Sequence, residues 1–251
     1  MGGLMLFLFS SLAAAAQSSV GFDPSEEGPK TTYTHRYEAG LSLHTRGMGC
    51  ILERGAYRGV GKVSTWSLEM VSMKHPKEVR SFNPVYEQAK GYVYGKVNSF
   101  YILRLGWGKR MVSTPKLRNG GVSAGWHFSF GPALGLTKPV YLEIGYPNIP
   151  YRYLITERYD PLLHGTDDIY GRAGSLNGIL EVTPHLGAYV RGALDFEYGG
   201  TRESLRMLSV GAQLDGFFNR ISIMAEDFNQ NNRLYFTLFA HWTMGRQKFK
   251  T

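Results

Sequence analysis

The sequence predicts an all-β protein, an antiparallel transmembrane β-barrel of about ten strands, with eight to twelve allowed. Apolar residues recur at every second position in many segments, which is the period of a β-strand. An apolar N-terminal segment predicts export, and no later segment approaches the roughly 20 apolar residues that a membrane-spanning helix needs. A transmembrane strand needs only about 9 to 11 residues, so a mean hydropathy of -0.22 is compatible with a membrane protein.

The N-terminal segment predicts the domain organisation. Residues 1–16 are apolar and end in Ala14, Ala15 and Ala16, which predicts a secretory signal cleaved after Ala16, although no Lys or Arg precedes the apolar run. The polar residues 17–32 then form an N-terminal linker, residues 33–246 the barrel domain, and residues 247–251 a basic C-terminal tail.

Alternation is clearest over residues 122–130, where Trp126, Phe128 and Phe130 oppose His127 and Ser129. The ten segments that alternate in this way are 37–44, 48–53, 64–72, 100–107, 122–130, 140–144, 188–198, 208–215, 221–226 and 234–244. In the last of them the even positions are apolar, and we expect them to face lipid while His241 faces the lumen. A soluble sandwich also alternates, so further observations have to distinguish the two folds.

Aromatic residues and charges supply those observations. Large aromatic side chains lie near the ends of apolar strand faces, where a transmembrane barrel places its interfacial girdles. The predicted girdle residues are Trp66, Tyr101, Trp107, Tyr198 and Trp242. The opposite faces carry residues of both charges, which can pair inside one lumen because an unpaired buried charge is costly. The predicted lumen network consists of Glu69, Arg104, Glu143, Arg191, Asp195, Glu197 and His241.

The connections between predicted strands are uneven. Turns at 56–61, 199–203 and 217–220 are tight, whereas 74–92 and 147–177 are long. Ten strands that start in the periplasm would place 74–92 outside the cell and 147–177 inside, where turns are usually short. Two additional strands within 151–184 would remove this conflict.

The net charge of +8 indicates which kinds of binding partner to expect. Basic residues gather at 74–80, at 109–118 and at 246–250, and they suit outer-membrane lipid, another envelope protein or a cell-wall polymer. Nucleic acid is not expected for an exported protein. The single cysteine, Cys50, excludes an internal disulfide and is expected to be a half-buried strand residue, and the histidine spacings predict no metal or other cofactor.

Four segments carry a resemblance to a known family. Residues 74–78 (KHPKE), 94–101 (YGKVNSFY), 133–141 (ALGLTKPVY) and 169–172 (IYGR) resemble a family of small outer-membrane β-barrel proteins of Bacteroidota-type bacteria. The resemblance covers nearly the whole mature chain. It implies a Gram-negative outer-membrane location and a barrel fold, and it implies no activity.

One group of residues suggests chemistry. His127 and Ser129 share a strand face, and Glu143 lies on the next predicted strand, which resembles the His-x-Ser and Glu of outer-membrane lipid A deacylases. A base within reach of a hydroxyl is the arrangement that nucleophilic catalysis requires. Phe130 stands where that family has Asn, however, and polar lumen residues that bond one another explain the same pattern.

These observations favour an outer-membrane barrel with a structural or binding role in the cell envelope, its lumen largely filled by side chains. A general diffusion porin is not expected at this size. The alternatives are an outer-membrane lipid hydrolase that uses His127, Ser129 and Glu143, and a soluble periplasmic sandwich that binds a ligand.

Overall fold

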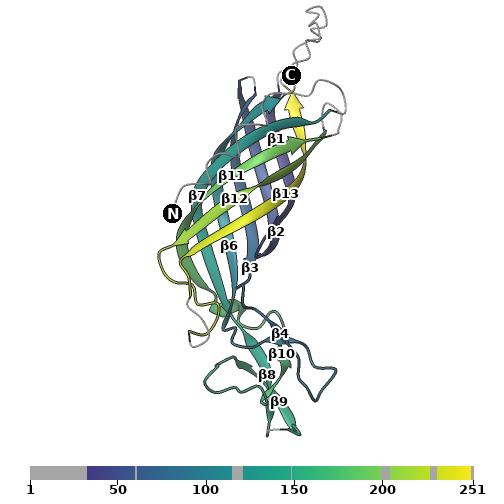
Figure 1. Ribbon diagram of the computed structural model, residues 1–251, viewed down its shortest axis with the longest axis vertical. Coiled ribbons are helices and arrows are strands. Elements are labelled where there is room, and N and C mark those ends of the chain that lie inside the picture. The colour runs from purple at the N-terminus through teal and green to yellow at the C-terminus, as the bar shows by residue number, and fades with distance from the viewer. Residues whose placement is uncertain are drawn as a thin grey trace, which may run out of the picture. The chain divides into compact units, whose positions relative to one another are not determined.

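The computed structural model describes residues 33–59, 61–114, 121–147, 149–198, 204–226 and 231–249, so the predicted signal (1–16) and linker (17–32) lie outside the described residues. Eight strands close into a barrel (Figure 1). They are β1 (Tyr33–His44), β2 (Gly47–Gly59), β3 (Lys62–Met73), β6 (Asn98–Thr114), β7 (Ser123–Pro139), β11 (Thr183–Glu197), β12 (Ser204–Phe217) and β13 (Leu234–Phe249).

The barrel is an antiparallel meander. Each barrel strand pairs with the next barrel strand along the chain, and β13 pairs with β1 to close the ring. Following the paired residues once around the barrel from Phe236 leads back to β13 at Arg246, ten positions further along the strand. With eight strands, this shear corresponds to a strand tilt of about 40° and to an interior that side chains can fill.

The antiparallel barrel is confirmed, and its eight strands lie at the lower limit of the predicted range. Two of the ten predicted segments are not barrel strands. Residues 140–144 belong to β8 (Tyr141–Tyr146), which lies in a separate sheet. Residues 221–226 contribute one isolated bridge, between Met224 and Lys96. Their alternation arises because Ile221 and Ile223 are both buried in an apolar cluster at the barrel end.

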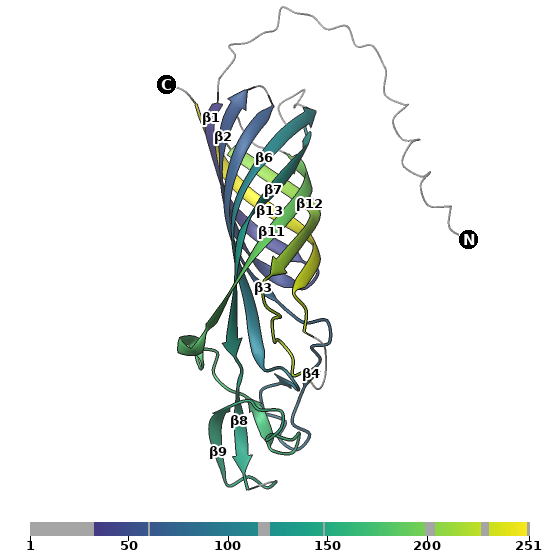
Figure 2. The same ribbon diagram turned by 90° about the vertical axis from the view of Figure 1, so that its left-hand side faces the viewer.

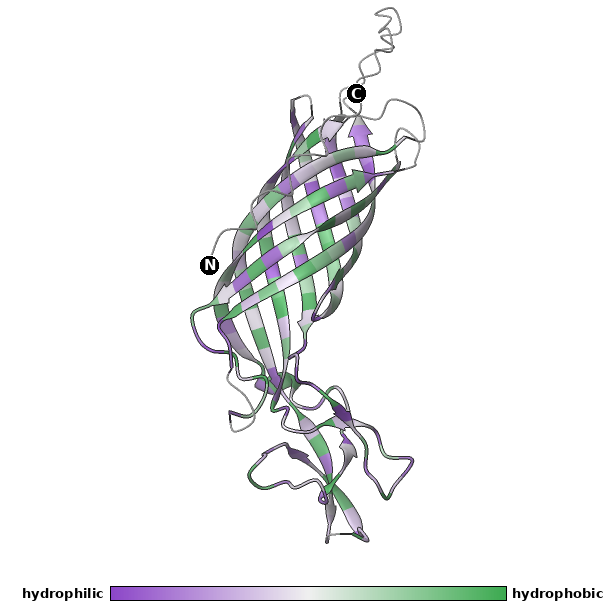
Figure 3. Ribbon diagram, in the orientation of Figure 1, coloured by the Kyte–Doolittle hydropathy of each residue, from purple (hydrophilic) through white to green (hydrophobic). Residues whose placement is uncertain are grey.

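The outer surface of the barrel is apolar, and most of the side chains inside it are polar. Hydrophobic and hydrophilic residues alternate along the barrel strands (Figure 3). On the outer faces, Leu41, Leu52, Leu105 and Leu194 are between 54% and 58% exposed. Side chains of the alternate positions are buried and include ionised groups. On β13, Leu234, Phe236, Leu238, Trp242 and Met244 are exposed, whereas Tyr235, Phe239 and His241 are buried. The apolar side chains of the last strand therefore face outward and His241 faces the interior, as the pattern predicts, and lipid contact stays a prediction.

The sole cysteine lies on this outer surface. Cys50 is exposed on β2, between the exposed Met48 and Leu52, and is not the half-buried residue that we expected. In the described part of the chain, no helix is long and apolar enough to cross a membrane.

Connections differ between the two ends of the barrel. At the terminus end, where β1 begins and β13 ends, the connections span 60–61, 115–122 and 198–203. At the opposite end, here the loop end, they span 45–46, 74–97, 140–182 and 218–233. Both long insertions therefore leave the same end of the barrel. The conflict predicted for ten strands disappears, and the predicted tight turn at 217–220 is replaced by the longer connection 218–233.

The long connections contain their own sheets. β8, β9 (Tyr153–Arg158) and β10 (Ile169–Arg172) form a three-stranded sheet in the order β10-β8-β9, here called the loop sheet. Figure 2 shows β8 and β9 beyond the end of β7. β4 (Arg80–Ser81) pairs with β5 (Tyr92–Val93), and a short 3-10 helix, η2 (Ile179–Glu181), precedes β11. The two additional strands proposed within 151–184 thus exist as β9 and β10, outside the barrel.

The last barrel strand is longer than predicted. β13 continues to Phe249, and Gln247 and Lys248 pair with Arg36 and His35 of β1. Residues 247–249 therefore belong to the barrel and not to a tail, and residues 250–251 lie outside the described part.

Candidate functional site

The barrel interior contains two clusters of buried ions. In the cluster nearer the terminus end, Arg110 is central. Its Nε donates to Asp195 at 2.5 Å, and its Nη1 lies 2.8 Å from a Glu53 oxygen and 3.3 Å from a Glu38 oxygen. Arg36 Nε donates to the same Glu38 oxygen at 2.5 Å. Two guanidinium groups thus face three carboxylates in a space closed to solvent.

The second cluster lies nearer the loop end. Arg104 binds Asp215 with two parallel bonds of 2.7 and 2.9 Å, and its Nη1 donates to Glu69 at 3.1 Å. Arg191 also pairs with Glu69, and its Nε donates to Gln213 at 2.8 Å. All four ionised side chains are at most 2% exposed. Because each charge has an opposite charge beside it, burial does not leave an uncompensated ion.

Two histidines lie beside these clusters. His127 Nδ1 is 2.9 Å from Asp195. His241 Nε2 is 3.2 Å from Glu69, a distance that permits an ion pair although the two atoms are not aligned as a hydrogen bond. Glu69 also accepts a hydrogen bond of 2.6 Å from the Ser42 hydroxyl. Each of the two clusters therefore joins side chains from several barrel strands across the interior.

The predicted lumen residues divide into three groups. Glu69, Arg104, Arg191, Asp195 and His241 lie in the two clusters. Glu197 is half-buried near the terminus end, where it lines a small space together with Arg36 and Asp195. Glu143 is not in the lumen. It lies on β8, where it pairs with Thr156 and Gly171 of the loop sheet, because the chain leaves the barrel after Pro139.

Sequence reasoning missed several members of the network. They are Arg36, Glu38, Glu53, Arg110, Gln213 and Asp215. Each one occupies the polar side of an alternating strand, and this is the signal that could have found it. Arg110 was instead assigned to an exposed basic segment at 109–118. Its neighbour Lys109 does face outward, but Arg110 points into the barrel and is 2% exposed.

The proposed hydrolase residues are not assembled. His127 and Ser129 both point into the barrel, but Glu143 lies in the loop sheet. The partner of His127 is Asp195, and the buried Ser129 hydroxyl has no hydrogen-bond partner among the described residues. A lipid substrate would reach the outer surface of the barrel, whereas these side chains face the filled interior. The arrangement therefore does not support lipid hydrolysis.

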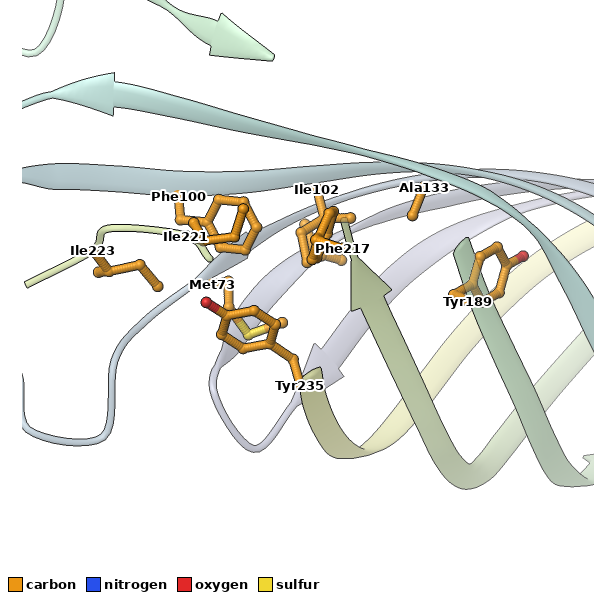
Figure 4. Close-up of a cluster of buried hydrophobic side chains, with 10 residues drawn as sticks. Met73, Phe100, Ile102, Ala133, Tyr189, Phe217, Ile221, Ile223 and Tyr235 are labelled. Atoms are coloured by element: carbon orange, nitrogen blue, oxygen red, sulfur yellow. The ribbon is translucent and has the colours of Figure 1, made fainter. Parts of the chain in front are cut away.

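An apolar cluster closes the loop end of the barrel (Figure 4). Phe100, Phe217 and Tyr235 pack with ring centroids 5.5 to 6.0 Å apart. Ile221 and Ile223 from the connection 218–233 complete the cluster and are fully buried. Backbone bonds hold them in place, since Val97 and Asn98 both donate to the Ile223 carbonyl. Within the lumen, the apolar cluster thus lies at the loop end, and the two ionic clusters lie between it and the terminus end.

The loop sheet buries apolar side chains, whereas the barrel buries many ionised ones. Its own core is apolar and contains Leu142, Ile144 and Ile169, all at most 1% exposed. Tyrosines surround this core: Tyr86 stacks on Tyr151 with ring centroids 5.2 Å apart. Burial raises the pKa of the Tyr151 hydroxyl, which donates to the backbone carbonyl of Asp167. These contacts fix the long connections in a defined structure.

The predicted girdle residues lie on the outer surface. Trp66 and Trp107 are paired in register on β3 and β6, and the Trp107 ring packs edge-on against Phe130. Trp242 Nε1 donates to the Tyr198 hydroxyl at 2.7 Å. Tyr101 lies near the opposite end of β6 from these residues and is half-buried.

Comparisons with known proteins add a likeness in structure. No family model and no curated protein matches the sequence. Two solved structures of small outer-membrane β-barrels match. Ail, the attachment invasion locus protein of Yersinia pestis, has 6% identity and a TM-score of 0.38 over 86% of this chain and 100% of its own. Neisserial surface protein A has 9% identity and a TM-score of 0.32 over 85% of this chain and 94% of its own. At these values, neither match assigns the chain to a family or to a function.

Proposed function

We propose that this chain is an integral outer-membrane β-barrel protein with a structural or binding role in the cell envelope. The inverted polarity of the barrel carries the proposal. A barrel in water places polar side chains outside and apolar side chains inside, whereas this barrel exposes leucines and tryptophans and buries ion pairs. Lipid is the solvent that stabilises such a surface, and a closed ring of strands leaves no backbone group unpaired in it.

Loop lengths support an orientation in that membrane. Bacterial outer-membrane barrels have short turns in the periplasm and longer loops outside the cell. The terminus end would accordingly face the periplasm, and the connections 74–97 and 140–182, with the loop sheet, would face the outside. Exposed cations at the terminus end, among them Lys62, Lys109 and Arg246, would then meet phospholipid headgroups.

The filled lumen favours binding over transport. The apolar cluster and the two ionic clusters occupy the interior in the described part of the chain, and the interior space lined by Arg36 and Asp195 has a volume of only about 10 Å³. The loop-end connections, in contrast, expose Phe82, Tyr153, Leu162 and Leu180, which are 57% to 97% exposed. These exposed apolar side chains on structured connections offer positions at which a partner could bind. An envelope protein is the partner that we propose for this surface.

Membrane fractionation tests the location. We expect the protein to remain with outer membranes in a density gradient, and its folded form to migrate differently from the boiled form on a gel. The variant Leu105→Arg is the informative comparison, because an outward arginine near the bilayer midplane costs about 2–4 kcal/mol. Recovery of the unaltered protein in the soluble fraction would refute a membrane function.

Cysteine labelling tests the orientation. With Cys50 replaced by Ser, Leu163→Cys places a single thiol on an exposed connection at the loop end. We expect a membrane-impermeant maleimide to label this thiol in intact cells. The matched variant Lys62→Cys, at the terminus end, should react only after the outer membrane is permeabilised. The reverse result would mean that the loop sheet faces the periplasm.

A further inference from the structure

A cavity of about 350 Å³ opens where the barrel meets the loop-end connections. Lys74, Arg80, Lys96 and Arg172 line it, together with the single carboxylate Glu78. They come from two separate stretches of the chain: the connection between β3 and β6 supplies Lys74, Glu78, Arg80 and Lys96, and β10 supplies Arg172. The fold, and not a run of basic sequence alone, therefore assembles the positive charge.

Only one of the four cations is neutralised by a described residue. Lys96 Nζ donates to Glu78 at 2.6 Å, and the second Glu78 oxygen accepts a bond from the His75 backbone N–H. Lys74, Arg80 and Arg172 make no ion pair with any residue that the structure describes, and the Arg80 guanidinium lies 5.4 Å from the centre of the Phe82 ring. Three cations thus converge on one cavity without a counter-ion, which favours an anionic ligand.

The cavity floor is apolar. Tyr92 and Leu142 are buried core residues of the loop-end connections and the loop sheet, and Val140 lies beside them. Ser99 also lines the cavity and supplies a hydroxyl group. A bare phosphate would leave the floor uncovered, whereas a sugar ring has both an apolar face and hydroxyl groups.

The position of the cavity bears on the source of such a ligand. Lys74 directly follows the last residue of β3, Ser99 is the second residue of β6, and Val140 joins β7 to β8. The cavity therefore lies where the apolar outer surface of the strands ends. In a membrane-spanning barrel, this is the level of the lipid headgroups.

We propose that this cavity binds a sugar phosphate, with the phosphate held by Lys74, Arg80 and Arg172 and the sugar lying against Tyr92 and Leu142. The same chemistry occurs in the headgroup of an outer-leaflet glycolipid and in a free sugar phosphate. The lipid source rests on the proposed membrane function, whereas binding of the phosphate ester itself does not.

The test uses the purified mature protein in detergent and in nanodiscs, with folding verified by the gel shift on boiling. Calorimetry with glucose 1-phosphate, with glucose and with inorganic phosphate measures the free ligand. Nanodiscs that contain a bisphosphorylated diglucosamine glycolipid, or the same lipid without its phosphates, measure the lipid headgroup. We expect the phosphorylated sugar to bind at least tenfold more tightly than its unphosphorylated form in at least one of these two arms.

Charge-matched variants locate the site. The triple variant Lys74→Gln, Arg80→Gln, Arg172→Gln should weaken binding at least tenfold. The triple variant Lys77→Gln, Arg152→Gln, Arg158→Gln removes the same charge from nearby exposed positions and should change it less than twofold. Ser99→Phe, which fills the cavity and keeps its charges, should also abolish binding.

The outcomes separate the two sources and the two proposals. Binding of glucose 1-phosphate identifies a free ligand, and binding of the glycolipid alone identifies a headgroup. Absence of binding in both arms, or equal loss in both triple variants, overturns the sugar phosphate site. If the gel shift on boiling is intact in those samples, the membrane function stands; a protein without that shift and without membrane association would overturn the proposed function instead.

Discussion

The barrel and the loop sheet use opposite rules of burial within one chain. In the barrel, Glu69 and Arg104 are buried and Leu105 is exposed; in the loop sheet, Leu142 and Ile144 are buried and the charged Arg158 is exposed. Both regions are antiparallel β-structure with the same period of two. The comparison shows that alternation fixes which side chains share a face but does not fix whether the polar or the apolar face is buried.

The largest expected effect comes from breaking the buried network of the barrel. Among the described residues, Glu69→Gln removes the one carboxylate that both Arg104 and Arg191 contact. A buried charge that loses its partner costs about 3–5 kcal/mol. The urea midpoint of unfolding in lipid vesicles, followed by tryptophan fluorescence, should fall accordingly. The matched variant Glu181→Gln removes an exposed pair with Arg158 at 3.8 Å and should lower the free energy of unfolding by less than about 1 kcal/mol.

A charge on the outer face of the barrel should have the next largest effect. Leu194→Arg places a guanidinium on the proposed lipid surface, and we expect a loss of about 2–4 kcal/mol in the free energy of unfolding from vesicles. Leu180→Arg lies in η2 at a position that is 97% exposed and should leave stability unchanged. Equal tolerance of both substitutions would mean that the outer surface of the barrel does not face lipid.

A smaller effect is expected in the apolar core of the loop sheet. Ile144→Val removes one methylene group from a fully buried side chain and should cost about 1 kcal/mol. That corresponds to roughly fivefold faster proteolysis of the 140–182 connection if cleavage follows local opening. The gel shift of the barrel on boiling should not change, since the two regions have separate cores. A loss of that shift would show that the loop sheet and the barrel unfold together.

The smallest effect concerns pH. Burial, and then the charge of Arg46, lower the pKa of His75 below its ordinary value of 6.5, so the folded connection 74–97 holds the neutral ring. Its Nδ1 accepts a bond from the Lys77 N–H. As the pH falls below 6.5, the unfolded segment takes up a proton that the folded one resists, and the folded form loses stability until the lowered pKa is passed. Proteolysis of this connection should therefore accelerate between pH 7.5 and 5.5, and His75→Asn should remove that dependence.

Alternation was sufficient to predict the outer surface of the barrel but not the extent of the barrel. Phe236 and Trp242 on β13 are exposed and His241 is buried, as the pattern predicts. The same pattern continues unchanged past Pro139 into β8, where the apolar side chains pack against protein and not against lipid. Glu143 was misplaced for that reason, because no local signal marks the point where a strand leaves the barrel.

The ion pairs required information that a single strand does not contain. Arg104 meets Asp215 across the interior from a strand more than 100 residues away, at a level that the shear of the barrel determines. The polar faces of the strands identified candidate network residues such as Asp195. Which two residues pair across the interior depends on both the number of strands and their stagger. The sugar phosphate cavity depends in the same way on long connections that period-two alternation does not describe.

The closing pair of strands has a consequence for biogenesis. β1 finds its second neighbour only in β13, so Ser42 is joined to His241 and Tyr37 to Arg246. Until β13 has been synthesised and has paired with β1, one edge of β1 keeps a row of unpaired backbone N–H and C=O groups. Such an edge can pair with a strand of another chain. Ring closure therefore requires the complete barrel sequence, and a chain that lacked β13 would leave β1 and β12 each with an unpaired edge.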